Sequence, residues 1–227
     1  PRRSIMKENT LAIIPAYNES RYLSATIKQT LPFMPVLVVN DGSTDNTPQI
    51  AQQAGANLIH NPTNLGKGAA LKKGFQYAIK HDYGTVITLD GDGQHDPREI
   101  PLFLDKYAST GAKLIIGKRD FSQMPFVRRL ANQTGSYFLN AVHPQYIPDN
   151  QSGYRLLTKP VMELVLESQE SGFEFEVEMI LLSLEHNILI DWVPIKTIYL
   201  SGDSKIKPIQ HTKNYIRILW KVYRSNL

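Results

Sequence analysis

Two carboxylates stand two residues apart directly after the apolar run 85–88. An apolar run of this kind predicts a buried strand, and Gly91 and Gly93 allow the chain to turn tightly where that strand ends. Asp90 and Asp92 can therefore converge on one point. Because two convergent acids repel each other, we expect a divalent cation between them, and hard oxygen ligands suit Mg²⁺ or Mn²⁺. The alternative is a solvated turn rich in aspartate and glycine.

Apolar runs alternate with amphipathic segments through the first half of the chain, and these elements must position the acid pair. The expected strands are residues 11–14, 36–39, 57–60, 85–89 and 113–117, and the expected helices are residues 21–30, 47–54, 67–80 and 98–109. Near-continuous apolar strands separated by helices predict an α/β fold, in which helices cover both faces of a parallel sheet.

The second half of the chain is less regular. Its expected helices are residues 126–142, 159–167, 174–185 and 211–223, its expected strand is residues 151–158, and residues 188–200 are expected to be extended. The sequence has no internal repeat, low-complexity segment or obvious linker. We therefore expect one catalytic domain over residues 1–227.

Polar residues follow all five expected strands of the first half. These clusters are residues 15–19 (PAYNE), 40–45 (NDGSTD), 64–68 (NLGKG), 90–94 (DGDGQ) and 118–119 (KR). Ligands of parallel sheets bind beyond the carboxyl ends of the strands. We therefore place the functional site at this edge of the sheet.

The first two clusters carry groups that suit a nucleotide. The ring of Tyr17 offers a face on which a nucleobase can stack. Glu19 offers a hydrogen-bond acceptor, unless it only complements the start of a helix. Asp41 can accept hydrogen bonds from a base or a ribose, and the alternative is an Asx turn with Gly42 and Ser43.

The next three clusters carry groups that suit a diphosphate and a metal. Residues 64–68, with Lys67, are similar to an anion-binding turn, although they lack the spacing of a P-loop. Gln94 can complete the metal site through its amide oxygen. We expect His95 at the surface, with metal ligation as the alternative. Arg119 can pair with a phosphate or form a surface ion pair.

Three further polar segments lie in the second half. Residues 149–155 (DNQSGYR) bring a carboxylate, a hydroxyl, an aromatic ring and a guanidinium close together, or form a turn before a strand. Residues 173–178 (FEFEVE) carry three acids, which favour a helix start unless one of them binds a sugar hydroxyl. Residues 201–207 (SGDSKIK) can close over a diphosphate as a lid or form a solvated connector.

The composition excludes some function classes. The chain has 227 residues and a formal net charge of +4. It has no cysteine, so thiolate and disulfide chemistry is excluded.

The polar first residues lack the apolar core of a signal peptide, and no apolar run approaches the roughly 18 residues of a membrane span. We therefore expect any membrane contact to be peripheral. Residues 209–227 are expected to form a basic amphipathic helix that lies on the membrane or packs on the domain.

The order of the motifs resembles that of the family-2 glycosyltransferases with the GT-A fold. These motifs are IPAYNE, VVNDGSTD, NLGKGAALKKGF, LDGDGQHDP, GKR, DNQSGYRLLTK, FEFEVEM and GDSK, and they extend from residue 11 to residue 207. Within that family the chain is most similar to the dolichyl- or polyprenyl-phosphate mannose synthase and glucosyltransferase branch. The resemblance implies the GT-A fold, with a mostly parallel central sheet and helices on both faces.

The resemblance also implies roles for individual residues. The residues implied to hold the nucleotide base and ribose are Pro15, Ala16, Tyr17, Glu19, Val39 and Asp41. Those implied to hold the sugar diphosphate are Asp90, Gly91, Asp92, Arg119 and Lys205, to which the anion-binding turn adds Lys67. The implied metal ligands are Asp92 and Gln94, with Asp90 beside them. The acceptor side is expected to include Asp149, Ser152, Arg155, Arg128 and Arg129.

One position departs from the family pattern. The mannose synthases carry an arginine a few residues before the GxSK loop, whereas this chain has residues 199–201 (YLS) there. An expected phosphate contact is therefore missing or is supplied by Arg128, Arg129 or Lys207.

The resemblance implies that a hexose, mannose or glucose, moves from a GDP- or UDP-sugar to a polyprenyl or dolichyl phosphate with inversion at the anomeric carbon. A metal at Asp92, together with Lys205 and Arg119, is expected to stabilise the charge that develops on the leaving diphosphate.

The acceptor decides which other groups are needed. A lipid phosphate is already anionic, so it needs no strong base but needs cations, for which Arg128, Arg129 and Arg155 are candidates. A hydroxyl acceptor needs a base, and Asp149 is then the candidate.

Other functions remain open at this point. They are glycosyl transfer to a saccharide or another hydroxyl compound, nucleotidyl transfer, and non-catalytic nucleotide binding. A nucleotidyltransferase is expected to carry a glycine-rich loop after its first strand, where this chain has residues 15–19. We expect no nucleic-acid partner, and a cytoplasmic protein at the cytoplasmic face of a membrane.

Overall fold

The computed structural model describes residues 9–120, 140, 146–196 and 198. Its strands are β1 (Thr10–Ala16), β2 (Val36–Asp41), β3 (Asn57–Asn61), β4 (Thr85–Thr88), β5 (Leu114–Arg119), β6 (Arg155–Thr158) and β7 (Ile190–Ile195). Its helices are α2 (Leu23–Thr30), α3 (Thr47–Gln53), α4 (Lys67–Lys80), the 3₁₀ turn η1 (Pro97–Glu99), α5 (Ile100–Thr110), α7 (Lys159–Val165) and α8 (Phe175–Glu185). These bounds agree closely with the predicted elements.

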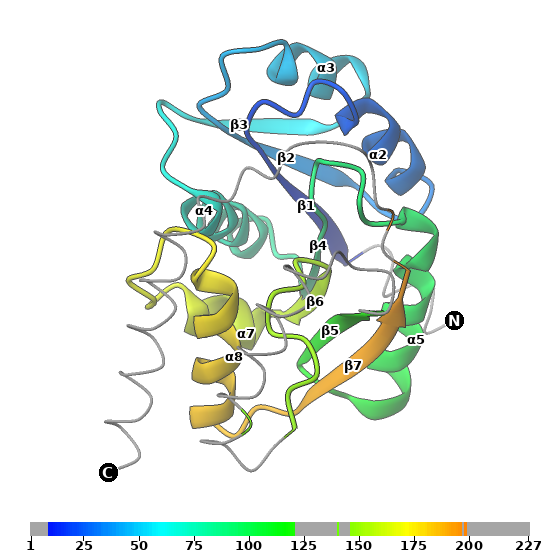
Figure 1. Cartoon of the computed structure of the whole chain (residues 1–227), viewed down its shortest axis with the longest axis vertical. Coiled ribbons are helices and arrows are strands. Elements are labelled where there is room, and N and C mark those ends of the chain that lie inside the picture. Colours follow the sequence, from blue (N-terminus) through cyan, green and yellow to red (C-terminus); the bar gives the residue numbers. More distant parts are fainter. Residues whose placement is uncertain (1–8, 121–139, 141–145, 197, 199–227) are drawn as a thin grey trace.

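The strands form one seven-stranded sheet in the order β3-β2-β1-β4-β6-β5-β7 (Figure 1). β1 is parallel to β2 and β4, β2 is parallel to β3, and β5 is parallel to β7. Only β6, among the strands of this sheet, is antiparallel to its neighbours, which are β4 and β5. The prediction of an α/β fold with a mostly parallel sheet is therefore confirmed.

The direction of β6 decides which residues reach the functional edge. Parallel strands end at the same edge of a sheet, so the segments that follow β1 to β5 meet there. Because β6 runs the opposite way, its first residue, Arg155, pairs with Thr88 at the end of β4 and with Ile116 of β5. The segment before β6 therefore reaches the same edge as the acid pair after β4.

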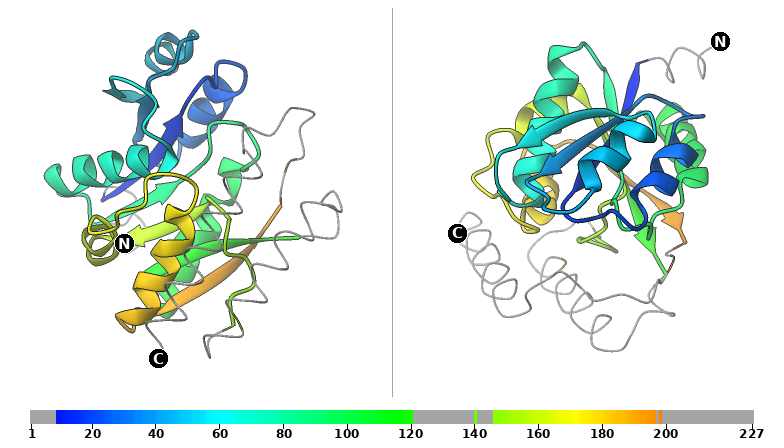
Figure 2. Two further views of the ribbon diagram at one scale, coloured as in Figure 1. Left: turned by 60° about the vertical axis from the view of Figure 1, so that its left-hand side comes forward. Right: turned by 90° about the horizontal axis from the view of Figure 1, so that it is seen from above.

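Helices cover both faces of the sheet, as predicted. Leu11 and Ile13 of β1 pack in a core with α4, α7 and α8. Ala12 and Ile14 pack in a second core with α2, α3 and α5. Successive strand residues point to opposite faces, so the continuous apolar run of β1 serves both cores. Figures 1 and 2 show the two helical layers on either side of the sheet.

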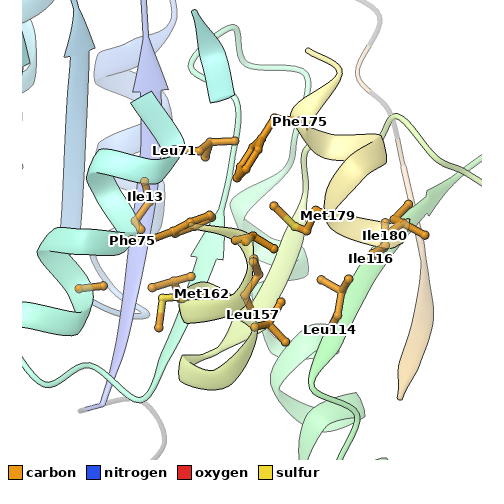
Figure 3. Packing of buried hydrophobic residues seen from close by; sticks show 14 of the residues in the cluster. Ile13, Leu71, Phe75, Leu114, Ile116, Leu157, Met162, Phe175, Met179 and Ile180 are labelled. Atoms are coloured by element: carbon orange, nitrogen blue, oxygen red, sulfur yellow. The ribbon is translucent and has the colours of Figure 1, made fainter. Parts of the chain in front are cut away.

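The larger core fixes the position of α4. Phe75 of α4 lies over Ile13 of β1 and faces Phe175 of α8, with a distance of 6.3 Å between the two ring centroids (Figure 3). A Cβ atom on Gly74 would lie 2.7 Å from Ile13 Cγ2, so α4 packs close to β1 only because residue 74 is glycine. Each fully buried large side chain contributes about 1.5–3 kcal/mol. This packing holds the first residue of α4, Lys67, near the functional edge.

Some predicted elements lie outside the described residues. These are the helix predicted over 211–223, the loop over 201–207 and, apart from residue 140, the helix over 126–142. In the part of the chain that the structure describes, no helix has the length and apolar character needed to cross a bilayer.

Candidate active site

A lysine from α4 holds the carboxylate of Asp90. Lys67 Nζ lies 2.5 Å from Asp90 Oδ1 and 2.9 Å from Oε1 of Glu176, in the first turn of α8. The side chains of Lys67 and Glu176 are only 14% and 5% exposed, so water screens these ion pairs weakly. Burial disfavours the charged form of Asp90, but Lys67 and then His95 outweigh it and lower the pKa of Asp90 to about 2. Asp90 is therefore ionised at neutral pH.

His95 fixes the backbone of Asp90. The N–H of Asp90 donates a hydrogen bond of 3.0 Å to His95 Nδ1, which therefore carries no proton. Burial lowers the pKa of His95 to about 4, so the ring is neutral at pH 7. The ring stacks on Tyr154 with 5.0 Å between centroids, and Tyr154 stacks on Phe103. The prediction of a surface position for His95 was wrong, because rings distant in sequence cover it.

The carboxylate of Asp92 is in a different electrostatic position. Its Oδ1 accepts a hydrogen bond of 2.9 Å from the N–H of Gln94, and Gly93 between them has a φ of 76°, which favours glycine. Burial, and next the charge of Asp90, raise the pKa of Asp92 to about 6. Lys67 acts in the opposite direction but does not cancel this rise. Asp92 therefore takes up a proton or a cation readily.

The side chains near Asp92 offer oxygen atoms, the donor type that a hard divalent cation prefers. Glu19 and Asp90 both add negative potential at Asp92, and a Cβ atom on Gly91 would lie 3.2 Å from Glu19 Cγ, so Glu19 reaches the turn after β4. Carboxylate and amide oxygens suit Mg²⁺ or Mn²⁺. Within the described ranges, no group of three or more His, Cys, Asp or Glu side chains is arranged to hold a metal.

Arg119, the last residue of β5, binds Asp149 through a two-pronged ion pair. Arg119 Nε donates to Asp149 Oδ2 at 2.7 Å and Nη2 donates to Oδ1 at 2.9 Å. The N–H of Arg119 also donates to Asp149 Oδ2 at 3.2 Å. The Asp149 side chain is fully buried, while that of Arg119 is 16% exposed. Asp149 therefore serves as the counter-ion that orients Arg119, and its carboxylate is not placed as a base facing an acceptor.

Arg155 and Ser152 are buried rather than open to an acceptor. Arg155 donates to the carbonyl oxygens of Ser152, Glu176 and Asn150, at 2.7, 2.6 and 3.3 Å. Its side chain is 1% exposed and Ser152 is 0% exposed. The expected contact of these two residues with an acceptor does not fit this burial. Arg155 instead joins the loop before β6 to the start of α8, which carries Glu176.

Asp41 holds the loop between β3 and α4. Its Oδ1 accepts hydrogen bonds from Asn61 Nδ2 at 2.7 Å and from the N–H of Leu65 at 3.1 Å. Its Oδ2 accepts from the N–H of Gly66 at 2.9 Å. Asp41 is 3% exposed, and these hydrogen bonds fix the backbone of the residues that precede Lys67. A contact with a base or ribose stays a prediction.

Residues 11–164 match the sequence profile described as glycosyl transferase family 2. The chain belongs to this glycosyltransferase family. The match begins in β1 and ends in α7, so it includes the turn after β4 and the start of α4. The predictions of the family and of a glycosyltransferase are confirmed, which disfavours nucleotidyl transfer and non-catalytic binding.

Curated relatives resemble this glycosyltransferase over most of its length. It is 29% identical over 212 residues to the undecaprenyl-phosphate mannosyltransferase of Micrococcus luteus, a similarity that covers 86% of each chain. It is 28% identical to the polyprenol monophosphomannose synthase of Mycolicibacterium smegmatis, over 83% of this chain and 77% of that one. It is 27% identical to the UDP-N-acetylglucosamine–dolichyl-phosphate N-acetylglucosaminyltransferase of Methanococcus voltae, over 82% and 84%.

Solved structures share the fold of this glycosyltransferase. The glucosyl-3-phosphoglycerate synthase of Mycobacterium tuberculosis in complex with UDP has a TM-score of 0.78 at 18% identity, over 97% of this chain and 83% of that chain. The same enzyme with Mn²⁺, UDP and glucosyl-3-phosphoglycerate has a TM-score of 0.72. The expected GT-A fold is thereby confirmed.

The predicted nucleotide side of the glycosyltransferase divides into exposed and buried residues. Tyr17 is 37% exposed, and its contact with a base stays a prediction. Ala16 and Val39 are buried in opposite cores, which leaves only their backbone atoms to contact a ligand. Pro15 is a residue of β1 and pairs with Val39 of β2 in the register of the sheet.

Two loops on this side are tied together. The N–H groups of Asn18, Glu19 and Ser20 donate to side-chain oxygens of Ser43, Thr47 and Asp45 at 3.0, 2.8 and 3.3 Å. These hydrogen bonds hold the segments after β1 and β2 against each other, which fixes the backbone that carries Tyr17 and Glu19.

The glycines at the start of α4 serve packing. A Cβ atom on Gly66 would lie 2.5 Å from the carbonyl oxygen of Ser171, and one on Gly68 would lie 2.6 Å from Phe175 Cβ. The N–H of Ala69 donates to the carbonyl oxygen of Ser171 at 3.0 Å. Residues 171–175 thus cover the helix start, so the interpretation of 64–68 as an anion-binding turn was wrong. Lys67 contacts the carboxylates of Asp90 and Glu176 and does not face an open anion-binding site.

Four of the predicted phosphate or acceptor contacts lie outside the described residues, namely Arg128, Arg129, Lys205 and Lys207, as do residues 209–227. They stay predictions.

Sequence reasoning did not identify the connection of Glu176 with Lys67, or the close approach of Gly153 to both. The acids of 173–178 were noticed, and their crowding at a helix start was the available signal. No local pattern indicates which distant lysine would pair with one of them.

Proposed function

We propose that this family-2 enzyme transfers a hexose from a nucleotide diphosphate sugar to a polyprenyl phosphate, with inversion and with a divalent metal. The observation that carries the proposal is the unequal acid pair after β4, in which Asp90 is compensated by Lys67 and Asp92 is not. Because the carboxylate of Asp92 has no ion-pair partner of its own in the described residues, it can bind a cation that enters together with a diphosphate.

The donor would bind at the carboxyl edge of the sheet. Asp92 and the amide oxygen of Gln94 would hold the metal, with Asp90 beside them, and the bound metal would neutralise charge that develops on the leaving diphosphate. Tyr17 would stack on the nucleobase. Mannose or glucose, carried by GDP or UDP, is the proposed hexose donor.

The ion pair of Arg119 and Asp149 favours a phosphate acceptor over a hydroxyl acceptor. A hydroxyl group needs a base to accept its proton, whereas a lipid phosphate is already an anion. Asp149 is fully buried and holds Arg119 at 2.7 and 2.9 Å, so removing it from that pair to act as a base is costly. Arg119, whose side chain is 16% exposed, stays protonated at the edge, where a phosphate would join Asp149 as a further anionic partner.

The names of the relatives support the acceptor class. The three curated relatives described above are named for undecaprenyl phosphate, polyprenol monophosphate and dolichyl phosphate. Because a lipid phosphate lies in a membrane, the proposed enzyme would act at the membrane surface. We therefore also propose peripheral contact with the cytoplasmic face of a membrane. The basic residues of 209–227 suit an anionic leaflet.

A transfer assay tests the proposal. The purified protein is incubated with Mn²⁺ and radiolabelled GDP-mannose or UDP-glucose in separate reactions. Each donor is tested with a polyprenyl phosphate in detergent and, in parallel, with a saccharide acceptor. We expect one donor to yield a labelled lipid and a free nucleoside diphosphate in equal amounts. Label that appears only on a saccharide acceptor would contradict the proposed acceptor, and no transfer from either donor would contradict the hexose donors proposed.

A further inference from the structure

Four segments that are far apart in the sequence meet at one partly buried ion cluster. Lys67 begins α4, Asp90 follows β4, Gly153 precedes β6 and Glu176 lies in the first turn of α8. Lys67 Nζ contacts Asp90 Oδ1 and Glu176 Oε1 at 2.5 and 2.9 Å. We call these three side chains, Lys67, Asp90 and Glu176, the ion triad.

Gly153 lies against all three side chains of the ion triad and leaves room for them. A Cβ atom at this position would lie 2.7 Å from Lys67 Nζ, 2.9 Å from Asp90 Oδ2 and 2.9 Å from Glu176 Oε1. The carbonyl oxygen of Gly153 accepts a hydrogen bond of 2.7 Å from Thr88 Oγ1, which fixes the glycine against the end of β4. Any side chain at residue 153 must therefore displace a charged group.

The ion triad separates the roles of the two acids after β4. Asp90 and Glu176 both contact Lys67, and the Glu176 side chain is 5% exposed. The backbone carbonyl oxygen of Glu176 accepts a hydrogen bond of 2.6 Å from the buried Arg155. Asp92 lies outside these ion pairs, and its Oδ1 accepts from the N–H of Gln94. A cation that enters the edge therefore meets one acid already compensated by the protein and one that is not.

We infer that Lys67 and Glu176 are positioning residues, which hold the Asp90 carboxylate in place and limit the negative charge offered to the metal, and that Gly153 keeps their space open. This inference rests on the proposed metal-dependent function. It assigns Lys67 a role through Asp90, in place of a direct contact with the donor phosphates.

The charges of the ion triad give this role a distinctive signature. Lys67→Met removes one positive charge beside Asp90, so the edge becomes more negative and should bind Mn²⁺ more tightly, by about threefold or more. Glu176→Gln removes one negative charge, so Mn²⁺ should bind more weakly by a similar factor. Lys67→Met removes the ion pair that holds Asp90, and Glu176→Gln removes the second contact that holds Lys67, so both should lower the kcat of transfer by about tenfold or more.

The experiment measures Mn²⁺ binding to the full chain by electron paramagnetic resonance, and kcat and KM for the donor in the transfer assay. The double variant Lys67→Met/Glu176→Gln restores the net charge, so its Mn²⁺ affinity should return to within about twofold of the original while kcat stays low. This variant also keeps the test valid if Lys67→Met alone does not fold. Lys67→Arg should recover part of kcat, because it restores the charge with a different shape.

Gly153→Ala tests the steric part without a change of charge. We expect a fall in kcat with Mn²⁺ affinity within about twofold of the original, because the methyl group displaces the triad but removes no charge. Lys80→Met and Glu185→Gln are the controls, since both residues are exposed at the far ends of the same two helices. They should change neither quantity.

The outcomes separate the inference from the proposed function. Changes of Mn²⁺ affinity in the same direction for Lys67→Met and Glu176→Gln would overturn the inference. So would an unchanged kcat for Lys67→Met with a tenfold rise in the KM for the donor, which is the result expected of a direct phosphate ligand. Failure of the original protein to bind Mn²⁺ would instead contradict the metal-dependent function, and the inference with it.

Discussion

Arg119 and Asp149 form a buried ion pair with two nearly parallel hydrogen bonds, at 2.7 Å between Nε and Oδ2 and at 2.9 Å between Nη2 and Oδ1. The pair joins the end of β5 to the segment before β6. Burial disfavours the charge of Arg119, but Asp149 outweighs it and raises the pKa of the guanidinium. The end of β5 therefore carries a guanidinium that stays protonated and is held in a fixed orientation, with its charge balanced by Asp149.

The first prediction concerns this pair. Asp149→Asn leaves Arg119 without its counter-ion, and we expect the free energy of unfolding to fall by about 3–5 kcal/mol. Arg119→Met should cost a similar amount, and the double variant should cost less than the sum of the two. Urea unfolding followed by circular dichroism measures these values. Lys118→Met, at the exposed neighbour, is the control, and equal stability of Asp149→Asn and the original protein would refute the prediction.

The second prediction concerns Asp92. Asp92→Asn should lower transfer by about 100-fold or more, because the proposed metal loses its charged ligand. The far-ultraviolet circular dichroism should be unchanged, since none of the ion pairs within the described part of the chain involves Asp92. Asp105→Asn, at an exposed position of α5, is the matched control. Turnover within about twofold of the original in Asp92→Asn would eliminate the metal role of this residue.

The third prediction is a pH dependence of stability without metal. The pKa of Asp92 is raised from 3.8 to about 6 by burial and by Asp90, so the folded protein holds this proton at a higher pH than the unfolded chain does. The stabilisation is therefore complete below about pH 4 and is lost as the pH rises through about 6. Because Asp92 is partly exposed, we expect a loss of about 1–2 kcal/mol.

Urea unfolding of the original protein and of Asp92→Asn, in chelator and at several pH values, measures this loss. The difference in unfolding free energy between the two proteins should change across the interval from about pH 4 to about pH 6 and stay constant above it. A difference that is independent of pH would show that burial does not perturb this carboxyl group.

The fourth prediction concerns nucleotide binding. Tyr17→Ala should weaken the binding of the nucleoside diphosphate by about tenfold, because stacking on an aromatic ring contributes roughly 1–3 kcal/mol. Tyr17→Phe keeps the ring and should bind within about twofold of the original. Isothermal titration with GDP and UDP provides the measurement. Equal affinity for Tyr17→Ala and Tyr17→Phe would place the base elsewhere.

Local patterns were sufficient to predict the strands and the edge at which the site lies. The apolar run before Asp90, the two glycines after it and the polar residues at the other strand ends all depend on neighbours in sequence. The direction of β6 was not predictable in this way, because the alternation of residues in a strand is the same in either direction. That direction is what brings Gly153 to the acid pair.

The partners of charged residues were the least predictable part of the site. Lys67 was expected at an anion and instead contacts Asp90 and Glu176, the latter contributed by α8. His95 was expected at the surface and is covered by Tyr154. Each of these contacts joins segments that only the tertiary fold brings together, so no spacing in the sequence encodes them.

The central claim is that a divalent ion joins the Asp92 carboxylate to the diphosphate of the donor. A crystal structure with Mn²⁺ and a nucleoside diphosphate, with data collected at the manganese absorption edge, tests it most directly. We expect an anomalous peak within about 2.3 Å of a carboxylate oxygen of Asp92 and of a diphosphate oxygen. A diphosphate bound at this edge with no manganese beside Asp92, or bound at another place on the protein, would contradict the claim.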